Sequence, residues 1–276
     1  MIKARTGRGC VLSGLVMALV LVGCRAGPAG DGASGPGTLR VMTYNIHHGR
    51  GMDGVIDLKR IAAVIKAAEP DLVALQEVDQ GVERTGRVDQ PAVLAALTGM
   101  HVVFEKNIDY QGGEYGNAVL SRFPIRRHTN HQLPSMYEGE QRGLLEVHVM
   151  HGGRPVVFYA THFEYRVDDT ERLASADMLR GLIEAQAVET LIVAGDINAR
   201  PDSAVLDKLT AFLNDAYASK AGEGYTFPAD TPDRRIDYIM SAHGSGLHAV
   251  TADVIDEPVA SDHRPLFVVF EVSVIE

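Results

Sequence analysis

Two polar residues follow a short apolar run in a way that can place them together. Residues 191–194 are apolar, Gly195 follows, and Asp196 and Asn198 come next, two positions apart. A run of this kind predicts a strand buried on both faces, and residues two apart in an extended chain point the same way. A carboxylate and an amide would then project together from the strand end. The alternative is that both residues only form the turn that ends at Pro201, because Asp and Asn favour turns.

Similar side chains lie at or next to other predicted strand ends: Asn45, Glu77, His162, Asp237, Asp262 and His263. Ligands of sheet proteins gather at such ends. Carboxylate and amide oxygens suit a hard cation such as Mg²⁺, and the absence of Cys after residue 24 disfavours zinc or copper. The carboxylates of Asp237 and Asp262 can orient a histidine, as hydrolytic sites require.

The adjacent pair His47 and His48 also suggests a metal site. Neighbouring residues of an extended chain point in opposite directions, so one ion could not readily take both rings. We therefore interpret these two histidines as structural.

The elements that must position these residues are predicted from periodicity. Apolar spacing and turn signals predict helices over 58–68, 90–97 and 168–185, and another that begins after Asp202 or Ser203. The pair Gly152-Gly153 predicts a hairpin, and 214–234 reads as a loop region. Strands are expected at 39–46, 72–77, 143–149, 155–162, 191–194, 235–240, 248–255 and 266–270, and 116–124 is expected to be a strand that enters a turn.

Length and charge restrict the class of protein. The chain has 276 residues, enough for one large domain or two small ones. It carries 26 basic and 36 acidic residues, a net charge of −10. No basic run is present of the kind that binds a phosphate backbone. This argues only weakly against nucleic acid, because bound cations can offset acidic charge locally.

The first residues predict export and lipid attachment. Lys3, Arg5 and Arg8 precede an apolar run over 11–22, which is shorter than the ~20 residues of a spanning helix. This pattern is typical of a signal peptide, over 1–23. The sequence 21–24, Leu-Val-Gly-Cys, resembles the bacterial lipobox, in which Cys24 receives lipid. The alternative is an ordinary signal peptide with a chance Cys.

Residues 24–37 are rich in Gly and Pro and predict a flexible linker. It would tether a catalytic domain over 38–276 to a membrane at the bacterial cell envelope, on the periplasmic or outer-membrane face. The only other cysteine is Cys10. The domain therefore has neither a disulfide nor a catalytic thiol.

Seven short motifs contain the polar residues selected above, together with Arg142: Thr43-Tyr-Asn45, Leu75-Gln-Glu77-Val, Arg142-Gly-Leu-Leu, Thr161-His162, Gly195-Asp196-Ile-Asn198, Arg235-Ile-Asp237-Tyr and Ser261-Asp262-His263-Arg-Pro. In type and order they resemble the motifs of the endonuclease/exonuclease/phosphatase superfamily, which has the deoxyribonuclease I-like fold. This resemblance covers nearly all of 38–276. It implies an α/β four-layer sandwich, with two packed, mainly antiparallel sheets and helices outside.

The resemblance also implies a role for each residue. Glu77 would be the principal ligand of Mg²⁺, or of Mn²⁺ in its place, with Asn45 and Asp262 nearby. Asp196 and Asn198 would orient the attacking water and the phosphate. His263, paired with Asp237, would act at the phosphate or as the base. His162 would contact the phosphate or protonate the leaving oxygen, and Arg142 is a further phosphate contact.

We therefore expect a monomeric, metal-dependent phosphoesterase that hydrolyses a phosphodiester or phosphomonoester by in-line attack of water. A lipid head group or small phosphoester is favoured, because the chain is acidic and lacks the disulfides of the secreted nucleases and a basic or aromatic insertion that would grip a duplex. An extracytoplasmic nuclease is the first alternative. A catalytically inert lipoprotein that serves as a binding module is the second; the completeness of the site argues against it.

Overall fold

The computed structural model describes residues 37–186, 190–220 and 222–273. These residues all belong to one compact unit. The expected signal peptide, Cys24 and all but the last residue of the linker lie outside the described residues. Within the described ranges, every helix is too short or too polar to span a bilayer.

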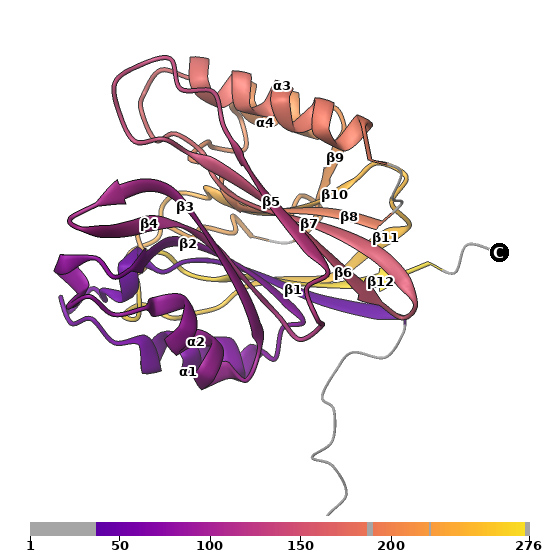
Figure 1. The fold of residues 1–276 in the computed structure, drawn as a ribbon. Helices are drawn as coiled ribbons and strands as arrows, with labels where there is room; N and C mark the ends of the chain where they lie inside the picture. The colour runs from indigo at the N-terminus through magenta and orange to yellow at the C-terminus, as the bar shows by residue number, and fades with distance from the viewer. Residues whose placement is uncertain (1–36, 187–189, 221, 274–276) are drawn as a thin grey trace, which may run out of the picture. The chain divides into compact units, whose positions relative to one another are not determined.

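The described chain forms two six-stranded sheets (Figure 1). The first sheet has the order β11-β12-β1-β2-β4-β3, and the second has the order β5-β6-β7-β8-β10-β9. Each sheet contains one parallel pair, β1 with β2 and β7 with β8, and its other pairs are antiparallel. The bounds are β1 Thr38–Asn45, β2 Leu72–Gln80, β3 His101–Tyr110, β4 Gly113–Ser121, β5 Arg127–Gln132, β6 Gly143–His151, β7 Arg154–His162, β8 Thr190–Asp196, β9 Leu213–Asp215, β10 Asp237–Ala242, β11 Leu247–Val254 and β12 Leu266–Val272.

The central strands have apolar residues on both faces, and successive residues point alternately into two different cores. In β1, Leu39 and Val41 pack against the other sheet, whereas Met42 and Tyr44 pack towards helices. The same alternation in β7 and β8 produces three separate apolar clusters, one between the sheets and one under the helices on each side. The predicted four-layer α/β/β/α sandwich is therefore confirmed.

The helices cover the outer faces of the two sheets (Figure 1). Helices α1 (Leu58–Ala68) and α2 (Gln90–Thr98) cover the first sheet, and α3 (Thr170–Glu184) and α4 (Ala204–Thr210) cover the second. Asp57 caps α1 as predicted, with Oδ1 accepting from the N–H groups of Lys59 and Arg60. Ser203, rather than Asp202, caps α4. The crossovers of the two parallel pairs contain α1 and α3.

Three strands lie outside the sequence prediction. β3 and β5 are edge strands of mixed or exposed residues, so they lack the apolar alternation on which the prediction depends. The short strand β9 begins the region that was expected to be a loop. The strand predicted from residue 235 begins only at Asp237, which is its first residue rather than an interior one.

Candidate active site

One cavity of about 510 Å³ gathers most of the residues selected from the sequence. It lies where β1, β7 and β8 end and where β10 and β12 begin. Its lining includes seven predicted site residues: Glu77, Arg142, His162, Asp196, Asn198, Asp262 and His263. Asn45 and Asp237 lie behind this lining, and each contacts a residue that belongs to it.

Strand register explains why three of these residues meet. In the parallel pair of β7 and β8, His162 lies opposite Asp196, and in the antiparallel pair of β8 and β10, Asp237 also lies opposite Asp196. Gly195 makes this close pairing possible, because a Cβ atom there would lie 2.0 Å from the backbone oxygen of Thr161. The row of polar side chains is thus a direct result of backbone pairing.

Two imidazoles flank the buried carboxylate of Asp196. Its Oδ2 atom lies 3.5 Å from Nε2 of His162 and 3.7 Å from Nε2 of His263. Nδ1 of His263 lies 2.9 Å from Oδ2 of Asp237. Nδ1 of His162 lies 3.1 Å from Nη1 of Arg142. Because a guanidinium can only donate, the neutral His162 ring carries its proton on Nε2, facing Asp196.

The surroundings give the two histidines opposite charge states. Burial opposes the charge on His263, but the adjacent and hydrogen-bonded Asp237, with Asp196, raises the pKa of His263 to about 10. Burial, together with Arg142 and His263, lowers the pKa of His162 well below its ordinary value. Burial and Asp237 also raise the pKa of Asp196 to about 7. Near neutral pH the cavity therefore presents an imidazolium and a neutral imidazole on either side of Asp196, whose carboxyl group gains or loses its proton in this pH range.

Asn198 lines the cavity beside Asp196, but the expected extended backbone between them is wrong. Asn198 has a left-handed backbone with φ of 51°. Its N–H donates to Oδ1 of Asp196 at 2.9 Å, and its Nδ2 donates to the carbonyl of Phe163 at 3.0 Å. The tight turn, rather than strand periodicity, brings both polar groups to the cavity.

Glu77 also reaches the cavity in a way that differs from the prediction. β2 continues beyond Glu77 to Gln80, so Glu77 is not the end of the strand. The pairing of β2 with β4 shifts between Leu75 and Val78, and Glu77, inside this bulge, has φ of 59°. A bulge re-aims a side chain relative to the regular alternation. The carboxylate of Glu77 consequently lines the cavity.

Two of the expected cation ligands, Asn45 and Glu77, are hydrogen-bonded to each other. Nδ2 of Asn45 donates to Oε1 of Glu77 at 3.0 Å and to Oδ2 of Asp196 at 3.2 Å. Ser261, next to Asp262, donates its hydroxyl to the backbone oxygen of Asn45 at 2.7 Å. The acidic side chains of Glu77 and Asp196, which the amide of Asn45 links, suit a hard divalent cation. The buried Oδ1 atom of Asp237 has no hydrogen-bond partner among the described residues, so this region has an unsatisfied oxygen as well.

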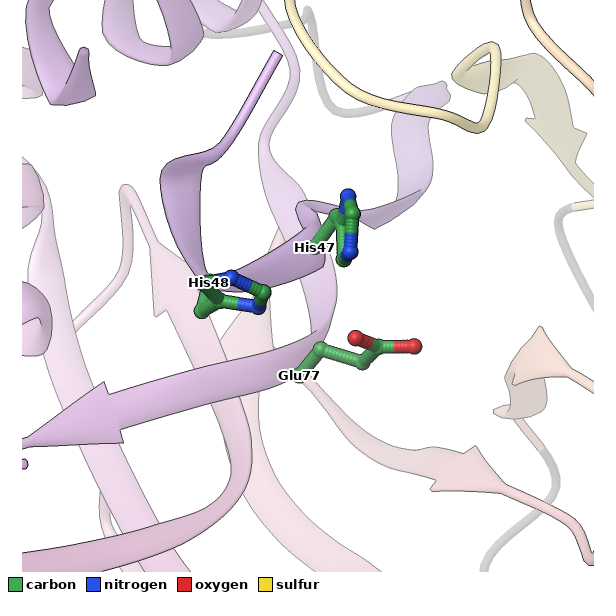
Figure 2. A group of neighbouring side chains, drawn as sticks. All are labelled: His47, His48 and Glu77. Atoms are coloured by element: carbon green, nitrogen blue, oxygen red, sulfur yellow. The ribbon is translucent and has the colours of Figure 1, made fainter. Parts of the chain in front are cut away.

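The backbone at His47 and His48 is not extended as we expected, and their ring nitrogens lie closer together than we expected. They lie in a 3₁₀ turn, His47–Gly49, and both have φ of 45°. One ligand atom from each, with one from Glu77, lies within 4.8 Å of the others. Figure 2 shows the two rings on one side of the Glu77 side chain. The expectation that the rings point in opposite directions is therefore wrong, and adjacency of the two histidines was the signal that could have found the group.

The remaining wall of the cavity was not found from the sequence. Arg84 donates from Nε and Nη2 to the carboxylate of Asp79, both at 2.8 Å, and its guanidinium lies 4.9 Å from the ring centre of Tyr110. The ring of Phe227 lies 4.8 Å from that of His263. These residues come from a hairpin and from loops, where no local spacing marks them. They give the cavity an aromatic and cationic wall, with Tyr115, Tyr165 and Arg234 among its other members.

A family model described as the endonuclease/exonuclease/phosphatase family matches residues 42–263. Among sequence relatives, protein YbhP of Escherichia coli (strain K12) is 28% identical over 242 residues, which cover 83% of this chain and 94% of that protein.

Solved structures share the fold. An endonuclease/exonuclease/phosphatase from Beutenbergia cavernae is 28% identical, with a TM-score of 0.67 and coverage of 86% of this chain and 72% of that chain. A mannosyl-6-phosphatase of Bacteroides thetaiotaomicron is 19% identical, with a TM-score of 0.70 and coverage of 84% and 99%. The human Nocturnin catalytic domain, solved with a bound sulfate anion, is 24% identical, with a TM-score of 0.67 and coverage of 86% and 94%. The last two similarities establish the fold alone.

Proposed function

This chain belongs to the endonuclease/exonuclease/phosphatase family, and we propose that it is a Mg²⁺-dependent phosphoesterase. Members of the family are hydrolases that act on phosphoesters. The proposal concerns the finer points, which are the cation, the reacting residues and the class of substrate.

The arrangement around Asp196 is the observation that carries the proposal. Two imidazoles approach Oδ2 of this buried carboxylate at 3.5 Å and 3.7 Å, and the cavity beside them also exposes the acidic side chains of Glu77 and Asp262. Hydrolysis of a phosphoester requires groups that orient and deprotonate water, and groups that stabilise charge on the phosphoryl and leaving oxygens. This cavity contains both kinds of group.

The cation would be held by Glu77, Asp262 and Asn45. Their carboxylate and amide oxygens fit Mg²⁺, and Mn²⁺ is the alternative. When bound, such a cation polarises phosphoryl oxygens and offsets their charge. The protein residues supply the rest of the reaction.

Water attacks phosphorus in line with the leaving oxygen, so one P–O bond forms as the other breaks. Asp196 and Asn198 orient the water and the phosphate. Within the cluster of Asp196, Asp237 and His263, Asp196 accepts the proton from the water. His162, neutral and held by Arg142, donates a hydrogen bond from Nε2 to a phosphoryl oxygen. The charged His263 donates its proton to the leaving oxygen and regains one from Asp196.

We further propose a lipid head group or small soluble phosphoester as the substrate. A cavity of about 510 Å³ is of the size that encloses a small ligand. The acidic chain lacks the basic run expected for a long polyanion. One fold neighbour is a mannosyl-6-phosphatase, which is consistent with a small phosphomonoester. The proposed site of action is the bacterial cell envelope, with a monomer anchored through a lipidated Cys24.

A parallel assay tests these proposals. The purified full chain is incubated, with Mg²⁺ or with EDTA, with supercoiled plasmid, total RNA, phospholipid and sphingolipid vesicles, and a chromogenic phosphodiester and monoester. The Glu77→Gln variant is the catalytic control, and His128→Ala, on the edge strand β5, is the matched control outside the cavity. We expect Mg²⁺-dependent release of a phosphorylated head group or hydrolysis of a small ester.

Efficient nicking of the plasmid with untouched lipids and small esters would instead identify a nuclease. If none of these substrates is hydrolysed in a metal-dependent way, the result would favour the inert binding module. In either case the preferred substrate class would be wrong.

A further inference from the structure

The cluster of His47, His48 and Glu77 has a composition unlike the oxygen-donor set assigned to Mg²⁺. It offers two imidazole nitrogens and one carboxylate oxygen within 4.8 Å of one another, and Figure 2 shows that two consecutive residues supply the rings. Imidazole nitrogen suits borderline transition-metal ions, whereas Mg²⁺ prefers oxygen. Two histidines and one glutamate also form a known ligand set for zinc with an open coordination position.

The backbone holds this cluster in a conformation that side chains rarely adopt. His47 and His48 have φ of 45°, and Glu77 has φ of 59°, all in the left-handed region. Two strong contacts fix the turn: Nε2 of the buried Gln90 donates to the carbonyl of His48 at 2.8 Å, and the N–H of Arg50 donates to the carbonyl of His47 at 2.8 Å. The three side chains are thus pre-arranged by the fold rather than gathered on a flexible loop.

The ring of His48 has an unsatisfied polar atom. The residue is only 7% exposed, and Nδ1 has no hydrogen-bond partner among the described residues. Buried polar groups without a partner are rare, and each calls for an explanation such as a bound ion. Burial lowers the pKa of His48, and so do the charges of Arg84, His47 and Arg50, so its ring is held neutral. Arg84 itself donates two hydrogen bonds to the carboxylate of Asp79.

We propose that His47, His48 and Glu77 form a second cation site, which binds a borderline divalent ion of the Zn²⁺ class. Glu77 is shared with the oxygen-donor set, since the two oxygens of a carboxylate can serve two ions. His47 connects the two sets as well, because its Nδ1 atom lies 3.6 Å from Oδ2 of Asp262. This inference concerns ion binding alone and does not depend on the proposed phosphoesterase activity.

Calorimetric titration of the full chain with Zn²⁺ and, separately, with Mg²⁺ tests the proposal. Cys10 and Cys24 are alkylated first, so that no thiol competes for zinc. The variants are His47→Ala and His48→Ala, and the matched control is His128→Ala, which removes another histidine that lies beside a carboxylate, 3.0 Å from Glu105. We expect a loss of Zn²⁺ affinity of about tenfold or more in both test variants, because the loss of an outer-shell partner alone typically costs that much. Mg²⁺ affinity and the control should stay unchanged.

Two results would overturn the second site. One is Zn²⁺ affinity that is the same in wild type and in folded His47→Ala and His48→Ala variants. The other is loss of Zn²⁺ and Mg²⁺ affinity together, which would place the histidines in a single common site. Thermal melting checks the fold of each variant. If the buried His48 variant does not fold, His47→Ala decides alone, because this side chain is 30% exposed and its removal leaves the core intact.

Discussion

Nδ1 of His263 lies 2.9 Å from Oδ2 of Asp237, and this contact fixes which ring atom faces the cavity. The opposite nitrogen, Nε2, is thereby directed towards Asp196. Asp237 begins β10, whereas His263 precedes β12 in the other sheet, so the contact connects the two sheets at the site. The contact orients the imidazole of His263 and stabilises its protonated form.

We expect His263→Ala to lower kcat by roughly 10²-fold or more, the scale of general acid–base and electrostatic contributions. Asp237→Asn should also lower kcat, because the neutral amide no longer supports the charged ring. The double variant should be little worse than His263→Ala alone, since residues that act as a unit are not additive. Steady-state kinetics on the preferred substrate would measure this. Fully additive losses would show that the two residues act separately.

Glu77→Gln keeps the size of the side chain but removes the charge proposed to hold Mg²⁺. We expect kcat to fall by roughly 10²-fold or more, with a marked rise in the Mg²⁺ concentration needed for half-maximal activity. Activity measured across a magnesium titration separates these effects. An unchanged magnesium requirement would remove Glu77 from the ligand set.

Glu146 allows a prediction about acid stability away from the cavity. Burial disfavours its charge, but hydrogen bonds from His148, His131 and Tyr159 hold its pKa below the ordinary value of 4.5. The charged form therefore stabilises the fold above pH 4.5, and this contribution is lost as the pH falls through the lowered pKa.

Glu146→Gln should lower the free energy of unfolding at pH 7 by about 1–3 kcal/mol, because it disrupts a buried hydrogen-bonded group. The difference from wild type should shrink as the pH is taken below 4.5. Urea unfolding at several pH values would measure it. A difference that is constant with pH would contradict the assignment.

Gly195→Ala tests the pairing that brings His162 and Asp196 together. The added methyl group would meet the backbone oxygen of Thr161 at 2.0 Å, so β7 and β8 would have to separate. We expect a loss of about 1–3 kcal/mol of stability, the usual cost of overpacking, together with reduced activity.

Gly181→Ala in α3 is the matched control, since a Cβ atom there has no neighbour within 4 Å. It should raise stability by about 0.5–1 kcal/mol, because alanine is the better helix former. Thermal or urea unfolding compares the two variants. Equal effects of both substitutions would contradict the argument from close strand contact.

Cys24→Ser tests the proposed anchor. The substitution should prevent lipidation and move the protein from the membrane fraction to soluble or uncleaved forms, since attached acyl chains supply the membrane affinity. Cell fractionation and mass spectrometry of the N-terminus would detect both changes. Wild-type protein that is found free in the medium with an unmodified N-terminus would rule out the lipoprotein proposal.

The sequence predicted the central strands well, because their apolar runs are long and both faces are buried. It failed at β3 and β5, where edge positions leave few apolar residues in a regular alternation. The four-layer arrangement followed from the ordered motifs, not from periodicity. Edge strands and layer order depend on contacts between distant segments, which local patterns do not record.

The sequence predicted which polar residues gather at the cavity, but neither its aromatic and cationic wall nor its local geometry. Glu77, Asn198, His47 and His48 all have positive φ values, which residues other than glycine rarely adopt. Tertiary contacts impose these conformations: the pairing of β2 with β4 sets the bulge at Glu77, and Gln90 holds the carbonyl of His48. The sequence prediction assumed an extended chain at His47 and His48, and it therefore placed their rings on opposite sides.

The insertion of β12 between β11 and β1 also determines when the site can form during synthesis. The hydroxyl of Ser261 binds the backbone oxygen of Asn45 across 216 residues, and Asp262 and His263 directly follow that serine. A nascent chain emerges from the ribosome N-terminus first, so the edge of β1 stays open until β12 is made. Completion of the first sheet and delivery of the last two site residues are thus a single late event. The chain therefore cannot gain a complete site before the first sheet is closed.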